Sequence, residues 1–188
     1  MAEYYLISQL PSLDGISENM MPPISEEKFL ELCQESLGKN TFDELKKLKL
    51  TPARQYEKSK SGLISDWNEG ERNLRLVLGK ARADKMNKNF DSEALENKSY
   101  PAGLVQAVRT ATEMENPMEA EKFLNNYRLE FLESLRPIDN FSEDFLFYYW
   151  LKLKLILRIR KFDPESGREA YKNIYGSIMN GDRLEAIQ

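Results

Sequence analysis

The densest apolar segment of the chain runs from Phe141 to Phe162, FSEDFLFYYWLKLKLILRIRKF, and predicts a central helix. A helical wheel places its apolar side chains on every side: Phe145, Tyr149 and Ile156 on one, Trp150 and Leu157 on a second, and Leu151 and Leu155 on the third. A helix that is apolar all round is either a membrane span or a core helix covered by other helices. The longest uncharged run, Phe145 to Leu151, is far too short to cross a bilayer, which favours a core helix.

Apolar residues at three- and four-residue spacing predict further helices over most of the chain. The expected ranges are 26–37, 42–50, 63–86, 102–114, 117–135 and about 164–180. The short apolar run over 4–10 fits either a strand or a helical turn, and the helices that follow it favour a helix. Start signals accompany several ranges: Ser25, Asn116 before Pro117, and Ser142 are N-cap residues, and Thr41 with Glu44 forms a capping box.

The pattern therefore predicts an all-α protein, a multi-helix bundle of about six to eight helices with no convincing sheet. Its division into domains stays open. The motif W-x6-LR occurs twice, from Trp67 to Arg75 and from Trp150 to Arg158. If the echo is a true repeat, it suggests two related helical lobes, 1–95 and 96–188; the alternative is one compact domain.

Two tryptophans and one cysteine are assigned to the core. Trp67 and Trp150 each have apolar neighbours at helical spacing, and an indole contributes a large buried area. Cys33 follows Leu32 in a helical stretch and has no second cysteine to pair with. It is interpreted as a buried thiol rather than a nucleophile.

Composition narrows the function classes. The 188 residues are 41% hydrophobic and 31% charged, as in an ordinary globular protein, and no apolar run of transmembrane length or N-terminal signal pattern occurs. A cytoplasmic protein without direct membrane insertion is expected. Histidine, the commonest general base and transition-metal ligand, is absent, and the nine glycines form no phosphate-binding motif. We therefore expect no enzyme activity, and no catalytic, cofactor-binding or metal-ligating residues.

Nucleic-acid binding is not expected either. The formal net charge is −4, which gives no overall attraction to a polyanion. A basic group does occur in the central helix: Lys152, Lys154, Arg158, Arg160 and Lys161. On the wheel these side chains scatter around the helix, so they form no stripe that could follow a phosphate backbone.

One polar segment interrupts an apolar helical face and is the candidate site. Gly70 and Glu71 lie between Trp67 and Leu74, where another apolar pair is expected. Gly70 would allow close backbone approach, and a buried Glu71 would need a partner, for which Arg75 is the nearest candidate. The favoured interpretation is a surface Glu71–Arg75 pair at the rim. The alternative is a structural or docking polar site made of Gly70, Glu71, Asn73 and Arg75.

A second candidate surface is acidic. Residues 113–144 carry mostly acids, whereas 72–88 and 152–161 carry mostly bases. The helix over 117–135 is expected to expose a negative face that includes Glu119 and Glu130, and this face suits a basic partner protein.

Three segments taken together carry a family resemblance: YYLISQLPSL at 4–13, DWNEGERNLRLVLGKARADKM at 66–86 and FLFYYWLKLKLILRIRKFDPESGREAY at 145–171. The chain resembles a family of uncharacterised bacterial proteins encoded among the subunits of V/A-type ATPases. More distantly, the core Glu71-x-Asn73-Leu74-Arg75 is similar to helices of the central-stalk protein of V-type ATPases. That stalk protein is an all-helical repeat protein that joins the rotor shaft to the membrane ring.

The resemblance implies a non-catalytic interaction subunit or assembly factor of a rotary ATPase that transports protons or sodium ions, with ATPase subunits as partners. The residues themselves permit an unrelated helical adaptor or regulator equally well. The identity of the partner, the stoichiometry, the oligomeric state and the coupling ion stay open.

Overall fold

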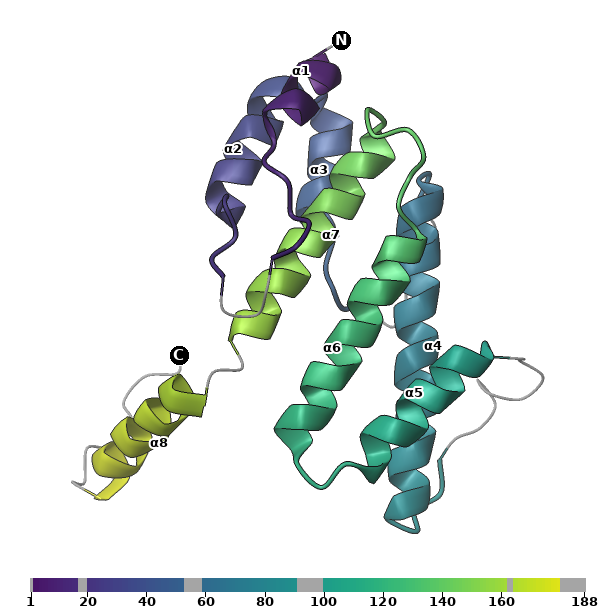
Figure 1. Ribbon diagram of the computed structural model, residues 1–188, viewed down its shortest axis with the longest axis vertical. Helices are drawn as coiled ribbons and strands as arrows, with labels where there is room; N and C mark the ends of the chain where they lie inside the picture. The colour runs from purple at the N-terminus through teal and green to yellow at the C-terminus, as the bar shows by residue number, and fades with distance from the viewer. Residues whose placement is uncertain (1, 17–19, 53–58, 91–99, 162–163, 180–188) are drawn as a thin grey trace.

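The computed structural model describes residues 2–16, 20–52, 59–90, 100–161 and 164–179. Within these ranges the chain forms eight helices and no strand (Figure 1), which confirms the predicted all-α bundle. The helices are α1 (Ala2–Gln9), α2 (Glu26–Ser36), α3 (Lys39–Lys47), α4 (Gly62–Lys85), α5 (Ala102–Glu113), α6 (Pro117–Ser134), α7 (Glu143–Arg160) and α8 (Pro164–Met179).

Side-chain caps begin four of the helices, and three of them were predicted. Ser25 accepts a hydrogen bond from the backbone N–H of Lys28, Asn116 from that of Met118, and Ser142 from that of Phe145. Ser61, which caps α4, was not predicted. Each cap satisfies a backbone donor that the first helical turn leaves without a partner.

The predicted capping box of Thr41 and Glu44 is wrong. Helix α3 begins at Lys39 with Gly38 as its N-cap, so Thr41 lies inside the first turn. Its hydroxyl instead donates a 3.1 Å hydrogen bond to Glu143 at the start of α7. A contact with a distant helix has therefore replaced the local cap.

Helix α7 is the centre of the bundle, as its all-round apolar pattern predicted. Its side chains are buried without a break from Leu146 to Leu153. In Figure 1, α1, α2 and α3 lie on one side of α7, and α6 and α4 lie on the other. Phe29 of α2 stacks against both Tyr149 and Trp150. Trp67 and Trp150 are both buried, which confirms their assignment to the core.

The buried apolar residues form two clusters. The first, which we call the α7 cluster, joins α1, α2, α3, the first turns of α4 and the end of α6 to α7. The second, the α5 cluster, consists of Leu74, Leu78, Leu104, Val108, Ala111 and Leu124. Both clusters take residues from 1–95 and from 96–188. The two lobes suggested by the repeated motif stay a prediction.

The segment after α1 is held to α7 by polar contacts. Lys152 is 7% exposed, and its ammonium group lies 2.5 Å from carboxylate oxygens of both Asp14 and Glu133. The Tyr149 hydroxyl donates a 2.8 Å hydrogen bond to the carbonyl of Pro11. The hydrogen bond from Lys152, followed by its charge, holds the pKa of Asp14 below its usual value against the opposing effect of burial.

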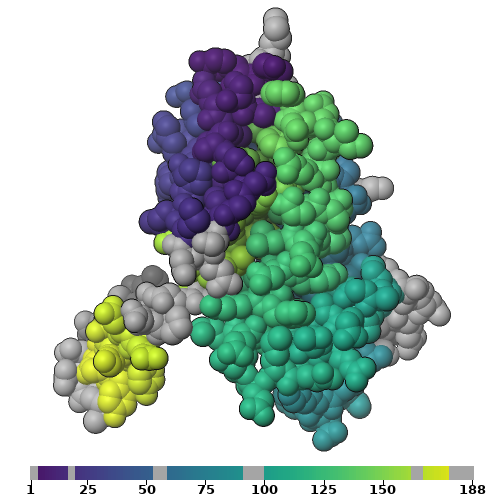
Figure 2. Space-filling view, viewed as in Figure 1, coloured from purple at the N-terminus to yellow at the C-terminus, as the bar shows by residue number. Residues whose placement is uncertain are grey.

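Helix α8 stands apart from the other described helices (Figures 1 and 2). Its apolar side chains Tyr171, Ile174 and Tyr175 are all more than half exposed, and the two tyrosine rings stack on each other. No described helix combines the length and the apolar composition needed to cross a bilayer.

Asp14→Asn should destabilise the fold at neutral pH and lose its effect in acid. The side chain is 56% exposed, so the expected loss of unfolding free energy is only about 0.2–1 kcal/mol. Because the folded-state pKa lies below the ordinary aspartate value of about 3.9, this stabilisation is complete above about pH 5 and declines as pH falls through the folded-state pKa. Urea unfolding of wild type and variant at several pH values measures the difference. The exposed Asp43→Asn on α3 is the control, and a difference that grows in acid would contradict the assignment.

Candidate functional site

Glu71 is a buried residue in the middle of α4, only 3% exposed. It lies one turn after Trp67 of the α7 cluster and one turn before Leu74 of the α5 cluster. The favoured prediction of a surface pair at the rim is therefore wrong. The Arg75 side chain is 46% exposed and contributes one hydrogen bond of 3.2 Å, so it covers the outer side of the carboxylate only.

The principal partner of Glu71 is Arg128 of α6. The guanidinium Nε donates to Glu71 Oε2 at 2.9 Å, and Nη2 donates to Oε1 at 3.2 Å. The side chains of Arg128 and Glu71 are 8% and 2% exposed. This is the parallel, two-bond geometry in which an arginine fork matches a carboxylate, and it balances both charges at the same time.

The pair extends into a network that spans three helices. Arg128 Nη1 donates to Asn125 Oδ1 at 3.1 Å and lies 3.5 Å from a carboxylate oxygen of Glu121. The same Glu121 oxygen accepts a 2.6 Å hydrogen bond from Arg158 of α7. The two arginines of the repeated motif, Arg75 and Arg158, thus lie at opposite ends of one network.

Arg128 and Asn125 were not predicted from the sequence, although a signal was present. Arg128 lies four residues after Leu124 and four before Leu132, so it falls within the apolar stripe of α6. A cation in one apolar stripe and a carboxylate in another are candidates for pairing across helices.

Gly70 allows α4 and α6 to approach closely, as the sequence suggested. A Cβ atom at this position would lie 2.3 Å from a ring carbon of Phe131. The Phe131 ring in turn stacks on Trp67, with 6.1 Å between ring centroids. A side chain at residue 70 would therefore displace an aromatic pair at the edge of the α7 cluster.

A cavity of about 270 Å³ lies between α4, α5 and α6, beside the buried pair. Gly70, Glu71 and Asn73 all line it, whereas Arg75 does not. The side-chain oxygen of Asn73 is buried and accepts a hydrogen bond from no described residue. Three of the four predicted site residues thus meet at one hollow.

The predicted acidic face is exposed on α6. Both Glu119 and Glu130 are accessible to solvent. Glu130 lies one turn from Tyr127, which lines the cavity. Burial and, to a smaller extent, the negative charge of Glu130 raise the pKa of the Tyr127 hydroxyl. The acidic face therefore reaches the cavity at this point.

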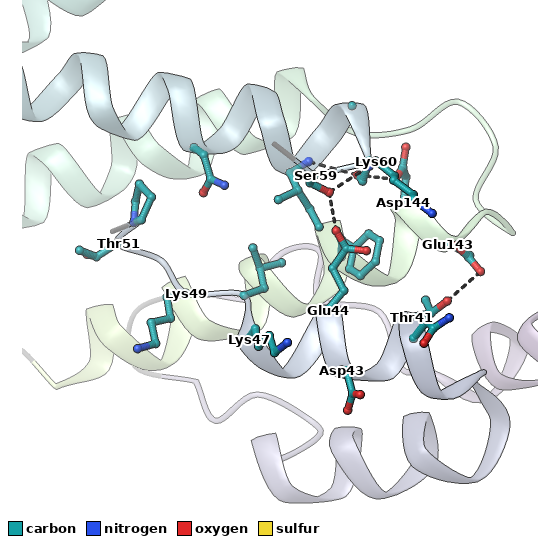
Figure 3. A pocket seen from close by; sticks show the side chains of 18 residues that line it. Thr41, Asp43, Glu44, Lys47, Lys49, Thr51, Ser59, Lys60, Glu143 and Asp144 are labelled. Carbon is teal, nitrogen blue, oxygen red and sulfur yellow. Dashed lines mark hydrogen bonds between the residues drawn. The ribbon is translucent and has the colours of Figure 1, made fainter. Parts of the chain in front are cut away.

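A wider groove of about 1080 Å³ lies between α3 and the first turns of α4 and α7 (Figure 3). Its carboxylates accept hydrogen bonds from nearby hydroxyl groups. Ser61 donates to Asp144 at 2.6 Å, and Ser59 donates to Glu44. Because Ser61 also caps α4, these contacts connect the helix starts to one another.

The described residues show no arrangement with evident catalytic chemistry. They contain no group of three or more histidine, cysteine or carboxylate side chains placed to hold a metal ion. Burial raises the pKa of the Cys33 thiol to about 12, which keeps it protonated at neutral pH. In the basic group of α7, Lys152 pairs with two carboxylates, Lys154 donates to the carbonyl of Leu48, and Arg158 binds Glu121.

Comparison with known proteins covers the second half of the chain. Residues 101–182 match the family model described as "Protein of unknown function (DUF2764)". The matched range contains α5, α6, α7 and α8, and with them Arg128, Asn125, Glu121 and Arg158. No curated protein and no solved structure matches the chain.

Glu71→Ala should cost on the order of 3–5 kcal/mol of unfolding free energy, because it leaves the Arg128 charge buried without its main partner. Glu71→Gln should cost less, since the amide keeps the size and part of the hydrogen bonding. The half-exposed Arg75→Ala is the control and should cost at most about 1 kcal/mol. Denaturant titrations of these variants, with Glu71→Met/Arg128→Met to remove both charges, measure the coupling. Additive effects of the two methionine substitutions would show that the pair is not coupled.

Gly70→Ala should destabilise by about 1–3 kcal/mol, because overpacking against Phe131 outweighs the better helix propensity of alanine. The same change in a Phe131→Leu background should be neutral or stabilising, because the ring is gone. Gly103→Ala is the matched control, since a Cβ atom there meets nothing within 4 Å. Thermal unfolding of these variants beside wild type tests the sign. A loss of stability that persists in the Phe131→Leu background would contradict the steric explanation.

Proposed function

We propose that this protein is a non-catalytic interaction subunit or assembly factor of a V/A-type rotary ATPase, and that it acts on the cytoplasmic side of the membrane. The proposal starts from the resemblance of residues 4–13, 66–86 and 145–171 to proteins encoded among the subunits of such ATPases. Ion transport, of protons or of sodium, would then be the work of the ATPase, and this chain would be no enzyme.

The observation that carries the proposal is the use of Glu71. The segment from Glu71 to Arg75 holds the likeness to the central-stalk protein, and in the structure Glu71 joins α4 to α6 through Arg128. A joint of this kind makes a stiff helical body, which suits a protein that positions other subunits. The exposed Glu119 and Glu130 supply a charged surface for a basic partner.

An unrelated cytoplasmic helical adaptor or regulator is the second candidate, and α8 favours it. The exposed stripe of Tyr171, Ile174 and Tyr175 is of a composition common in protein interfaces. Such a stripe would serve contact with any protein partner, whether or not it belongs to an ATPase.

Affinity purification of the tagged full-length protein from its native host separates the two candidates. Recovery of ATPase subunits is expected under the first proposal, and recovery of none would reject it. With the captured protein purified, Glu119→Lys/Glu130→Lys should slow association about three- to tenfold at low salt, because attraction between opposite charges speeds encounter. The exposed Asp43→Lys on α3 is the control. An association rate that is independent of salt and of these substitutions would leave the acidic face without a role in docking.

A further inference from the structure

The cavity between α4, α5 and α6 combines apolar walls with an acidic edge. Leu74, Leu104, Phe131 and Leu135 are among its apolar lining residues. Its volume of about 270 Å³ is at the lower limit of small-molecule pockets and suits one long side chain. An aliphatic stem inserted here would be removed from water along most of its length.

The charges around the cavity favour a cation. Glu71 contributes little net charge, because Arg128 balances it. Asp66 and Glu69 line the same cavity and are exposed, so their carboxylates stand where it meets solvent. The nearby Glu130 adds a third negative charge beside Tyr127. A basic group would therefore be attracted, and an acidic group repelled.

The hydrogen-bonding groups point to a donor. The buried oxygen of Asn73 accepts no hydrogen bond from the described residues, and the exposed edge presents two carboxylates, which only accept. A purely apolar side chain would leave the Asn73 oxygen unsatisfied, at a cost in binding free energy. Lysine and arginine both carry a long aliphatic stem and end in N–H donors only.

We propose that this cavity receives a lysine or arginine side chain of a partner protein, with the stem against Leu74, Leu104 and Phe131 and the cationic end at Asp66, Glu69 and Asn73. The proposal deepens the proposed function and rests on it, since it specifies how a docking partner is recognised. It also connects the segment from Gly70 to Asn73 with the acidic face of α6.

The direct test uses small probes and the full-length protein. N-acetyl-arginine methylamide and N-acetyl-lysine methylamide are titrated while the NMR signals of the leucine methyl groups are followed. Saturable shifts are expected at Leu74, Leu104 and Leu135. The neutral N-acetyl-citrulline methylamide should bind about three- to tenfold more weakly, because it lacks the charge. Equal binding of the neutral probe, tighter binding of N-acetyl-glutamate methylamide, or no saturable shift at these residues would overturn the proposal.

Variants confirm the location. Asp66→Asn/Glu69→Gln should weaken the cationic probes about three- to tenfold and leave the citrulline probe unchanged. Asp43→Asn, an exposed acid on α3, is the control and should change neither. All three substituted positions are exposed, so thermal unfolding should confirm that the folds are intact. Equal loss with the control variant would overturn the assignment to this cavity.

The capture experiment separates this inference from the proposed function. If wild type recovers ATPase subunits and Asp66→Asn/Glu69→Gln recovers few, both are supported. If both proteins recover them equally, the cavity is not the docking site and the inference fails, while the proposed function stands. If wild type recovers none but binds the cationic probes, the ATPase assignment fails and the preference of the cavity for a basic side chain is retained.

Discussion

The buried pair of Glu71 and Arg128 is the interaction on which the joining of the two apolar clusters depends. Removing two charges from water costs several kcal/mol for each ion, so the pair is tolerated only with complete hydrogen bonding. The two-bond contact, with Asn125 and Glu121 around the guanidinium, supplies that bonding. A shift of α4 along α6 by one turn would leave both charges without partners. The pair therefore determines the register of the two helices more than it adds to the overall stability.

The helices could be predicted because their signals are local. An apolar stripe, a proline after Asn116 and a serine at positions 25 and 142 are each contained within a few residues. Thr41 shows where this reasoning fails, since its hydroxyl has one possible partner in its own helix and another, Glu143, that only the fold brings near. Propensity and capping rules describe the first kind of contact and contain no information on the second.

The candidate site was located from the sequence, but its chemistry was not. Glu71 was recognised because a carboxylate in an apolar face is costly, and Gly70 because a missing side chain lets helices approach. The nearest cation along the helix, Arg75, was then chosen as the partner, because helical spacing links residues four apart only within one helix. Arg128 is 57 residues away in sequence. Its position in the apolar stripe of α6 marks it as unusual, yet helix pairing was needed to connect it with Glu71.

The order of the clusters along the chain affects how the protein can be made. The α5 cluster uses buried residues between 74 and 124, whereas the α7 cluster combines residues 6–67 with 132–156. A ribosome releases the chain from its N-terminus, so α1, α2 and α3 emerge long before the helix that covers their apolar faces. During that interval the partial bundle of α4, α5 and α6 can already assemble. The first third of the nascent chain is thus the part that depends on chaperones, until the last residues of α7 have left the exit tunnel.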